Sequence, residues 1–170
     1  MAPCLPSELT VVLAERRRAI AGAATGRVLD LGGWSDHLRE YAEEPTMLGD
    51  LHELGELDGV FDMIVSLVRT PLVQDMGVFI EGLVGHLAPD GIVAFLEPTR
   101  RPGRAGGRRW FGARAQRPFG ELHLDRDIPN EFRERQLFVT DLHRFEVASV
   151  AVPLRPFVDG RARRNRHMPN

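Results

Sequence analysis

Lysine is absent from this 170-residue sequence, and all 22 basic residues are arginine. Cysteine is almost absent too, because Cys4 is the one thiol and lies in a proline-flanked stretch. A single cysteine excludes a disulfide framework, and the histidines show neither zinc-finger spacing nor an HExxH pattern. We therefore expect no metal site, and a reducing, cytoplasmic setting.

Long apolar runs are also missing. No run approaches the roughly 18 residues that a membrane-spanning helix needs, and the opening MAPCLPSELT lacks the basic-then-apolar order of a signal peptide. Hydrophobic residues make up 43% of the chain, enough to bury one core at this length. The sequence predicts one domain over residues 1–163 without a membrane span, and a frayed tail over residues 164–170.

Charge is distributed unevenly around a net value of −2. Between Asp30 and Glu97 there are fourteen acidic residues against only Arg39 and Arg69, whereas residues 100–117 carry seven arginines and no acid. Two interpretations of the basic segment stay open. It is either a solvated loop or a surface that attracts an anionic substrate, a lipid headgroup or nucleic acid.

Patterns of buried strands and amphipathic helices alternate along the first hundred residues. Helical spacing predicts helices over 7–24, 35–42 and 78–87. Short apolar runs predict strands over 27–31, 46–48, 61–68 and 92–96, the last one preceded by a turn at 89–91. This alternation is typical of an α/β protein with an open, mostly parallel sheet and helices on both faces.

From residue 100 onward, the sequence no longer predicts alternating strands and helices. Residues 100–120 are rich in Gly and Arg with little periodicity, which favours a basic loop or lid. A helix is expected over 128–135, with Pro129 in its first turn. Apolar patterns over 137–145 and 156–162 then predict two strands that pair as an antiparallel hairpin.

Three motifs occur in one order: LDLG at 29–32, FDMIVS at 61–66 and LAPDGIVAFLEP at 87–98. In this order they resemble the class I S-adenosylmethionine-dependent methyltransferases. The stretches 119–145 and 155–163 are similar, more loosely, to the ubiquinone-biosynthesis-like and methyltransferase-like 7 branches of that superfamily. The resemblance implies a Rossmann-like fold, S-adenosylmethionine as cofactor, and methyl transfer to a small-molecule acceptor, anionic or lipophilic.

The sequence departs from that pattern in two places. The family's loop carries three alternating glycines, whereas Trp34 and Asp36 stand where the second and third would fall. About thirty residues separate Asp30 from Asp62, where the family fits two further strands with their helices. We therefore expect a sheet shortened by about one strand-helix unit.

Ligands of open α/β sheets lie beyond the carboxyl ends of the strands. Asp30 can order the loop that follows it or reach the amino-acid end of the cofactor. Asp50 lies twenty residues later, the spacing at which an acid meets ribose hydroxyls; by the other alignment it meets the adenine amine. The resemblance gives this candidate cofactor set: Asp30, Gly32, Gly33, Trp34, Asp50, Leu51, Ser66 and Leu67.

Methyl transfer from a sulfonium is an in-line displacement on carbon, and it needs alignment and desolvation more than a strong base. Glu97, His123 and Asp125 are the titratable groups best placed to orient or deprotonate a hydroxyl or thiol acceptor. Each also has a structural interpretation. Asp125 and Asp127 can charge the start of the next helix, and His123 can be a surface or hydrogen-bonded core histidine.

Other functions stay open at this point. A non-catalytic relative that has lost the cofactor fits the shortened sheet and the altered glycine loop. Only the arginine-rich segment supports a nucleic-acid-binding protein, and the absence of GxGxxG argues against NAD. A sheet that lacks a unit leaves an exposed edge or face, so we also expect a homodimer.

Overall fold

The computed structural model describes residues 7–32, 38, 45–48, 50–101, 122–150 and 154–164. Its strands are β1 (Val28–Asp30), β2 (Thr46–Met47), β3 (Phe61–Leu67), β4 (Leu87–Pro98), β5 (Leu137–Glu146) and β6 (Pro156–Arg164). They form one sheet in the order β2-β1-β3-β4-β6-β5. The first four strands run parallel, and β6 is antiparallel to β4 and β5. This mostly parallel sheet with an antiparallel end confirms the predicted Rossmann-like architecture.

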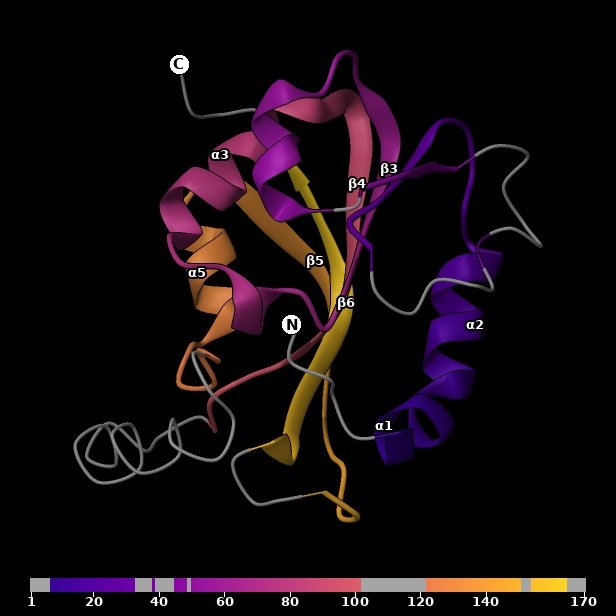
Figure 1. The fold of residues 1–170 in the computed structure, drawn as a ribbon, viewed down its shortest axis with the longest axis vertical. Coiled ribbons are helices and arrows are strands. Elements are labelled where there is room, and N and C mark those ends of the chain that lie inside the picture. Colours follow the sequence, from indigo (N-terminus) through magenta and orange to yellow (C-terminus); the bar gives the residue numbers. More distant parts are fainter. Residues whose placement is uncertain are drawn as a thin grey trace.

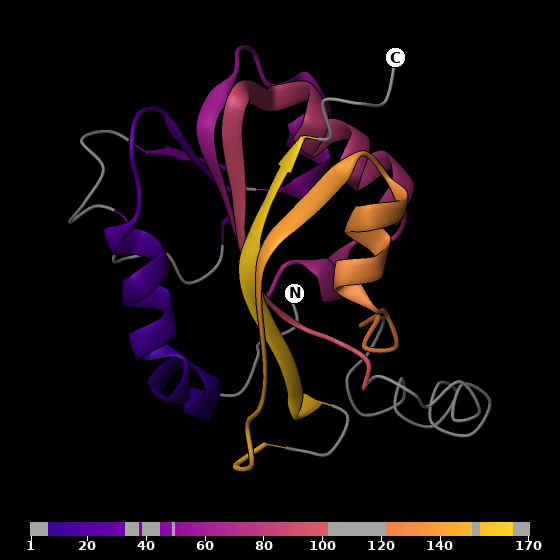
Figure 2. The same ribbon diagram turned by 180° about the vertical axis from the view of Figure 1, so that it is seen from behind.

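Helices cover both faces of this sheet (Figures 1 and 2). One face carries α3 (Met76–His86) and α5 (Ile128–Glu134), and the other carries α1 (Ser7–Val12) and α2 (Ala14–Gly22). Two 3₁₀ helices, η2 (Leu51–Glu56) and η3 (Thr70–Leu72), follow β2 and β3 along the chain. Among the described helices, none has the length and apolarity that crossing a membrane requires.

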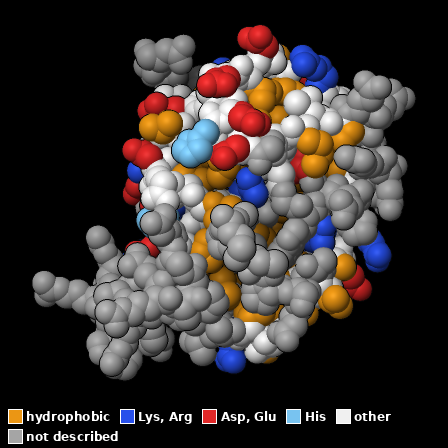
Figure 3. All heavy atoms as spheres, viewed as in Figure 1, with side chains coloured by type: hydrophobic (Ala, Val, Ile, Leu, Met, Phe, Trp, Pro, Cys, Tyr) orange, Lys and Arg blue, Asp and Glu red, His pale blue; other side chains and the backbone are white. Residues whose placement is uncertain are grey.

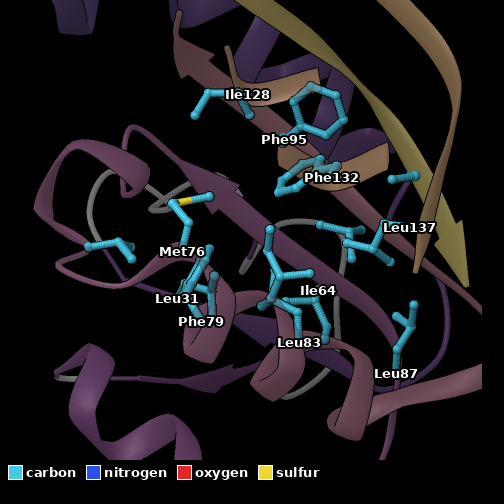
Figure 4. Close-up of a cluster of buried hydrophobic side chains, with 14 of the residues drawn as sticks. Leu31, Ile64, Met76, Phe79, Leu83, Leu87, Phe95, Ile128, Phe132 and Leu137 are labelled. Carbon is cyan, nitrogen blue, oxygen red and sulfur yellow. The ribbon is translucent and has the colours of Figure 1, made fainter. Parts of the chain in front are cut away.

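The sheet separates two apolar cores. Along β3, Ile64 packs toward α3 and α5, while its neighbours Met63 and Val65 pack toward α1 and α2. Because both faces are buried, the strand reads as a continuous apolar run instead of an alternating one. Figure 4 shows the first core, in which Phe95 of β4 meets Phe132 of α5 edge to face, with ring centroids 5.1 Å apart.

The predicted start of one helix and the predicted turn after it need correction. The α3 helix begins two residues before the predicted start, because the Asp75 side chain accepts hydrogen bonds from the N–H groups of Gly77 (2.7 Å) and Val78 (3.2 Å). Residues 89–91 lie inside β4, where the pairing register jumps from Phe61↔Leu87 to Met63↔Ile92. The turn signals therefore mark a bulge within the strand.

Two further boundaries differ. The helix predicted over 7–24 is interrupted at Leu13, the residue that separates α1 from α2 along the chain. The Leu13 side chain is fully buried. Arg164, which was predicted to begin a frayed tail, is instead the last residue of β6, and its guanidinium donates to the carbonyl oxygen of Val84. Apart from Leu38, the predicted helix over 35–42 lies outside the described residues. So do residues 102–121 and the chain after Arg164.

Between β1 and β3 the described chain contains one strand, β2, where the methyltransferase pattern has two. β2 pairs directly with β1 through Leu29↔Thr46 and Asp30↔Met47. Among the described residues the sheet is therefore one strand shorter than that pattern, as predicted, and β2, which precedes Asp50, lies beside β1.

Candidate functional site

The carboxyl ends of β1, β2, β3 and β4 meet at one edge of the sheet, because the four strands are parallel. Asp30 is the last residue of β1, and Glu97 lies one residue before the end of β4. Asp50 follows β2, and Arg69 follows β3. In open α/β sheets this edge is where ligands bind.

Asp30 and Gly32 form a tight turn at the end of β1. The Asp30 carboxyl is fully buried, and its Oδ1 accepts a hydrogen bond from the Gly32 N–H at 3.1 Å. Gly32 has a φ of +83°, and a Cβ at this position would lie 2.6 Å from the carbonyl oxygen of Leu48. Both the left-handed backbone and the close approach require glycine. The turn therefore packs directly against the backbone at Leu48, beside a buried carboxyl group.

Asp50 caps η2 at the same edge. Its Oδ1 accepts from the His52 N–H at 3.0 Å, and its own N–H donates to Glu53 Oε2 at 3.3 Å, which completes a capping box. The Asp50 side chain is exposed, and its charge acts on Arg69. The cap fixes the backbone at Asp50 while the residue stays open to solvent.

Arg69 lies among these carboxyl groups and was not part of the predicted site. Its Nη2 is 3.6 Å from the position that a Cβ of Gly32 would take. Burial lowers the pKa of Arg69, while nearby Glu97, Asp30 and Asp50 favour its charged form. Its Nε is buried and has no hydrogen-bond partner among the described residues. One signal in the sequence points to it: Arg69 is one of two bases in a stretch of fourteen acids.

The residue before Arg69 has a strained backbone. Val68 has a φ of 55°, in the left-handed region that β-branched residues avoid. Such a conformation costs about 1–3 kcal/mol and persists only where the surroundings hold it. Val68 is buried, and its N–H donates to the carbonyl oxygen of Leu96 at 2.8 Å. This turn carries the chain from β3 to Arg69 and η3.

Glu97 holds that turn in place. It is fully buried, and its Oε1 accepts from the Ser66 hydroxyl (2.6 Å) and the Arg69 N–H (3.1 Å). Its Oε2 accepts from the N–H (3.1 Å) and the hydroxyl (2.7 Å) of Thr70. Burial raises the pKa of Glu97 to about 7, although the four hydrogen bonds oppose this shift. With both oxygens engaged, Glu97 anchors the turn between β3 and η3.

Three other residues of the predicted cofactor set contact the interior of the protein. The Ser66 hydroxyl is directed to Glu97, and Ser66 itself is fully buried. Leu67 packs in the core under α1 and α2, and Leu51 packs against the core under α3. The contacts of these three residues are therefore with the protein's own core, whereas Asp30, Gly32 and Asp50 lie at or after the carboxyl ends of β1 and β2.

The segment that carries His123 lies against η3. The His123 N–H donates to the carbonyl oxygen of Pro71 at 2.8 Å, and its Nε2 lies 3.3 Å from Gln74 Oε1. Arg126 donates to the carbonyl oxygens of Thr70 (2.7 Å) and Gln74 (3.1 Å). These contacts hold the His123 backbone against η3 and its half-buried imidazole against Gln74.

Other predicted site residues are less constrained. Asp125 is exposed, and its charge favours the charged form of Arg126. Gly33 and Trp34 lie outside the described residues, as do five of the seven arginines over 100–117. Within the described chain, no group of three or more His, Cys, Asp or Glu side chains is arranged to hold a metal ion.

A hollow of about 490 Å³ lies elsewhere, between α2 and the β5–β6 hairpin. Its apolar lining consists of Ala19, Ile20, Ala23, Met63, Ala94 and Gly160. Its charged residues pair with one another: Arg16 and His143 both contact Asp159, and Arg161 lies 4.0 Å from Asp141. This hollow therefore offers paired charges, whereas the strand edge places one guanidinium among three carboxyl groups.

Comparison with known proteins identifies the fold. No protein-family model matches the sequence, and no curated protein matches it. Solved structures do match, among them the N-methyltransferase NodS from Bradyrhizobium japonicum, with a TM-score of 0.63 and 15% identity over 93% of this chain and 97% of that chain. The fold is that of the class I methyltransferases.

Two further structures share this methyltransferase fold. NodS in complex with S-adenosyl-L-homocysteine matches with a TM-score of 0.57 and 15% identity, over 94% of this chain and 91% of that chain. The StiE O-MT unit matches with a TM-score of 0.61 and 12% identity, over 95% of this chain and 77% of that chain. The likeness to the methyltransferases thus extends along nearly the whole chain.

Proposed function

We propose that this protein is an S-adenosylmethionine-dependent methyltransferase that acts on a small-molecule acceptor. The observation that carries the proposal is the turn from Asp30 to Gly32, at the carboxyl end of β1. It combines a fully buried carboxyl group with a left-handed glycine that lets the loop after β1 pack directly against the Leu48 carbonyl. The methyltransferase fold of the chain and the complex of NodS with S-adenosyl-L-homocysteine support the same proposal.

The described residues fit this cofactor. Asp50 is an exposed carboxylate that follows β2, the strand paired with β1, and is suited to accept hydrogen bonds from ribose hydroxyls. Asp30 offers a carboxylate to the amino-acid end, and Gly32 allows close approach to the backbone. Gly33 and Trp34 stay predicted members of the site. When bound, S-adenosylmethionine supplies an electrophilic methyl group on a sulfonium.

We propose that His123 is the base that removes the proton of the acceptor group. Its half-buried imidazole lies against Gln74, which follows η3, and can take a proton from a hydroxyl or thiol. Glu97 serves as a positioning residue, because its four hydrogen bonds fix the turn that carries Arg69 and Thr70. Asp125 stays a candidate for orienting the acceptor.

Binding of S-adenosyl-L-homocysteine tests the proposed function. The ligand is expected to bind in calorimetry and to raise Tm, because a ligand at a hundred times its Kd stabilises the folded state by about 2.7 kcal/mol. 5′-Methylthioadenosine, which keeps only the adenosine half, should bind more weakly. If neither ligand binds at millimolar concentration, the protein is a relative of the methyltransferases without the cofactor.

Replacing Asp50 tests where the adenosine lies. Asp50→Ala should weaken the binding of S-adenosyl-L-homocysteine about tenfold or more, since hydrogen bonds to a carboxylate are worth about 1.5–3 kcal/mol each. The variant also loses a helix cap, worth about 1 kcal/mol of stability. Asp75→Ala removes the comparable cap of α3 and is the matched control for that loss. Equal affinities in the two variants would place adenosine elsewhere.

A further inference from the structure

The hollow between α2 and the β5–β6 hairpin lies apart from the candidate cofactor site. It reaches Met63, near the start of β3, whereas Asp30 and Glu97 lie at the carboxyl ends of β1 and β4. Figure 2 shows α2 and the hairpin from behind. Its volume of about 490 Å³ suits a small organic molecule, since ligand pockets commonly measure about 300–1,000 Å³. A molecule bound here would be a second ligand, so the inference below does not rest on the proposed function.

The interior of this hollow is aliphatic. α2 contributes Ala19, Ile20 and Ala23 to one wall. β3 and β4 contribute Met63 and Ala94 to the floor. Ala19 is exposed, and Ile20 and Ala23 are only half-buried, so this wall still faces water. An aliphatic chain that entered the hollow would remove apolar surface of both partners from water, which favours binding.

The charged rim of the hollow is unevenly satisfied. Asp159 is mostly buried, accepts a hydrogen bond from Arg16, and lies 2.9 Å from Nδ1 of His143. By contrast, Arg161 Nε is 4.0 Å from Asp141 Oδ2, and the guanidinium makes no hydrogen bond within the described chain. The two side chains are 46% and 58% exposed, so water screens their attraction. The rim therefore keeps a guanidinium with unused donors, while its buried carboxylate is already engaged.

The acidic side chains of the protein do not gather at this hollow. Figure 3 shows them over the part of the molecule that carries α3. α3 covers one face of the sheet, and the hollow opens on the face covered by α2. The sheet and its two layers of side chains separate those acids from the hollow, and exposed charges farther apart than about 8 Å are largely screened at physiological ionic strength. An anion in the hollow is therefore not strongly repelled.

We infer that the hollow binds an aliphatic carboxylate of medium chain length, with its chain between α2 and β4 and its carboxylate on Arg161. A guanidinium presents a planar fork of donors that matches a carboxylate. Arg16 holds the wall of the site instead, because it is paired with Asp159 and lies 3.7 Å from the centroid of the Phe145 ring. An amine finds no equivalent partner, since the buried carboxylate of Asp159 is taken from both sides.

Calorimetric titration with octanoate tests this inference. Octanamide has the same shape without the charge and should bind about tenfold more weakly, because hydrogen bonds to charged groups are the stronger ones. Hexanoate should also bind about tenfold more weakly, since each buried methylene contributes roughly fourfold in affinity. Octylammonium should bind more weakly than octanamide, and acetate should not bind measurably.

Two variants locate the ligand. Arg161→Met should weaken octanoate about tenfold and change octanamide less than about twofold. Arg163→Met is its matched control, because Arg163 is exposed on the same strand and does not line the hollow. Ala19→Leu fills the hollow from α2 and should weaken octanoate and octanamide alike. Arg18→Leu adds the same side chain at an exposed position of α2 outside the hollow and should leave both affinities unchanged.

Several results would overturn the inference. Octanoate that does not bind at millimolar concentration shows that the hollow takes no such ligand, and equal affinity for octanoate and octylammonium shows unspecific partition of the chain. Octanoate binding that Ala19→Leu leaves unchanged lies elsewhere on the protein. A dimer in light scattering that Ala19→Leu dissociates would assign the hollow to a second copy of the chain. Binding of S-adenosyl-L-homocysteine should be the same in all four variants, so the proposed function is tested separately.

Discussion

Glu97→Ala is expected to lower the free energy of unfolding by about 3–5 kcal/mol, because each buried donor left without an acceptor costs about 1–3 kcal/mol. The substitution leaves four donors without their acceptor inside the protein. The hydroxyls of Ser66 and Thr70 can rotate to other partners, but the backbone N–H groups of Arg69 and Thr70 cannot. Denaturation in urea, followed by circular dichroism, measures the loss.

The matched control is Glu81→Ala, which removes an exposed glutamate from the middle of α3. Its effect should stay within about 0.5 kcal/mol, as for most surface substitutions. If Glu97→Ala costs no more than this control, the four hydrogen bonds do not hold the turn between β3 and η3. The positioning role of Glu97 would then be lost as well.

The second large effect concerns pH. Glu97 has its pKa raised from 4.5 to about 7 by burial. Between these two values the folded protein keeps the proton on Glu97 and the unfolded chain releases it, so stability falls as pH rises. The expected loss is about 3 kcal/mol from pH 4.5 to pH 7, with no further change from this group above about pH 8.

Comparison with Glu97→Gln isolates this contribution from the other titrating groups. The difference in unfolding free energy between the wild type and Glu97→Gln should shrink by about 3 kcal/mol over this range if the glutamine variant is taken as the pH-independent reference. The neutral acid can be accommodated because the Ser66 and Thr70 hydroxyls can accept as well as donate. A difference that stays constant from pH 4.5 to pH 8 would show that the carboxyl group titrates normally.

Much of the fold was predictable because local sequence and burial agree. The run from Phe61 to Leu67 is apolar on both faces, which favours a central parallel strand, and the structure confirms it. Pro129 begins the last described helix as predicted, and β5 and β6 pair antiparallel as predicted. The shortened sheet followed from the small number of residues between Asp30 and Asp62.

The errors came from places where tertiary contacts override local preference. Pro89, Asp90 and Gly91 are turn residues by composition, yet here they form a bulge because β4 is already paired with β3 at Leu87. Val68 is β-branched, and nothing in its sequence context indicates a left-handed backbone. That conformation depends on contacts with Leu96 and Glu97, which come from a later strand.

The candidate site was predicted in part. Asp30, Gly32 and Asp50 could be placed because they follow strands whose carboxyl ends meet. Arg69 could not be placed, since its approach to Gly32 depends on the turn at Val68. The roles of Gly33, Trp34 and the arginine-rich segment stay predictions, as does the homodimer.

The position of β6 has a consequence for how the chain reaches this structure. β6 lies between β4 and β5 in space but follows both in sequence. During synthesis, the edge of β4 that later pairs with β6 stays unpaired until residues 156–164 have left the ribosome. Until then β5 also cannot join the sheet, because in the described sheet it pairs only with β6. The ion pair between Arg16 of α2 and Asp159 of β6 cannot form before then either. Such late, distant pairings slow folding and leave an apolar strand edge open meanwhile, so the growing chain is most exposed to aggregation just before β6 is completed.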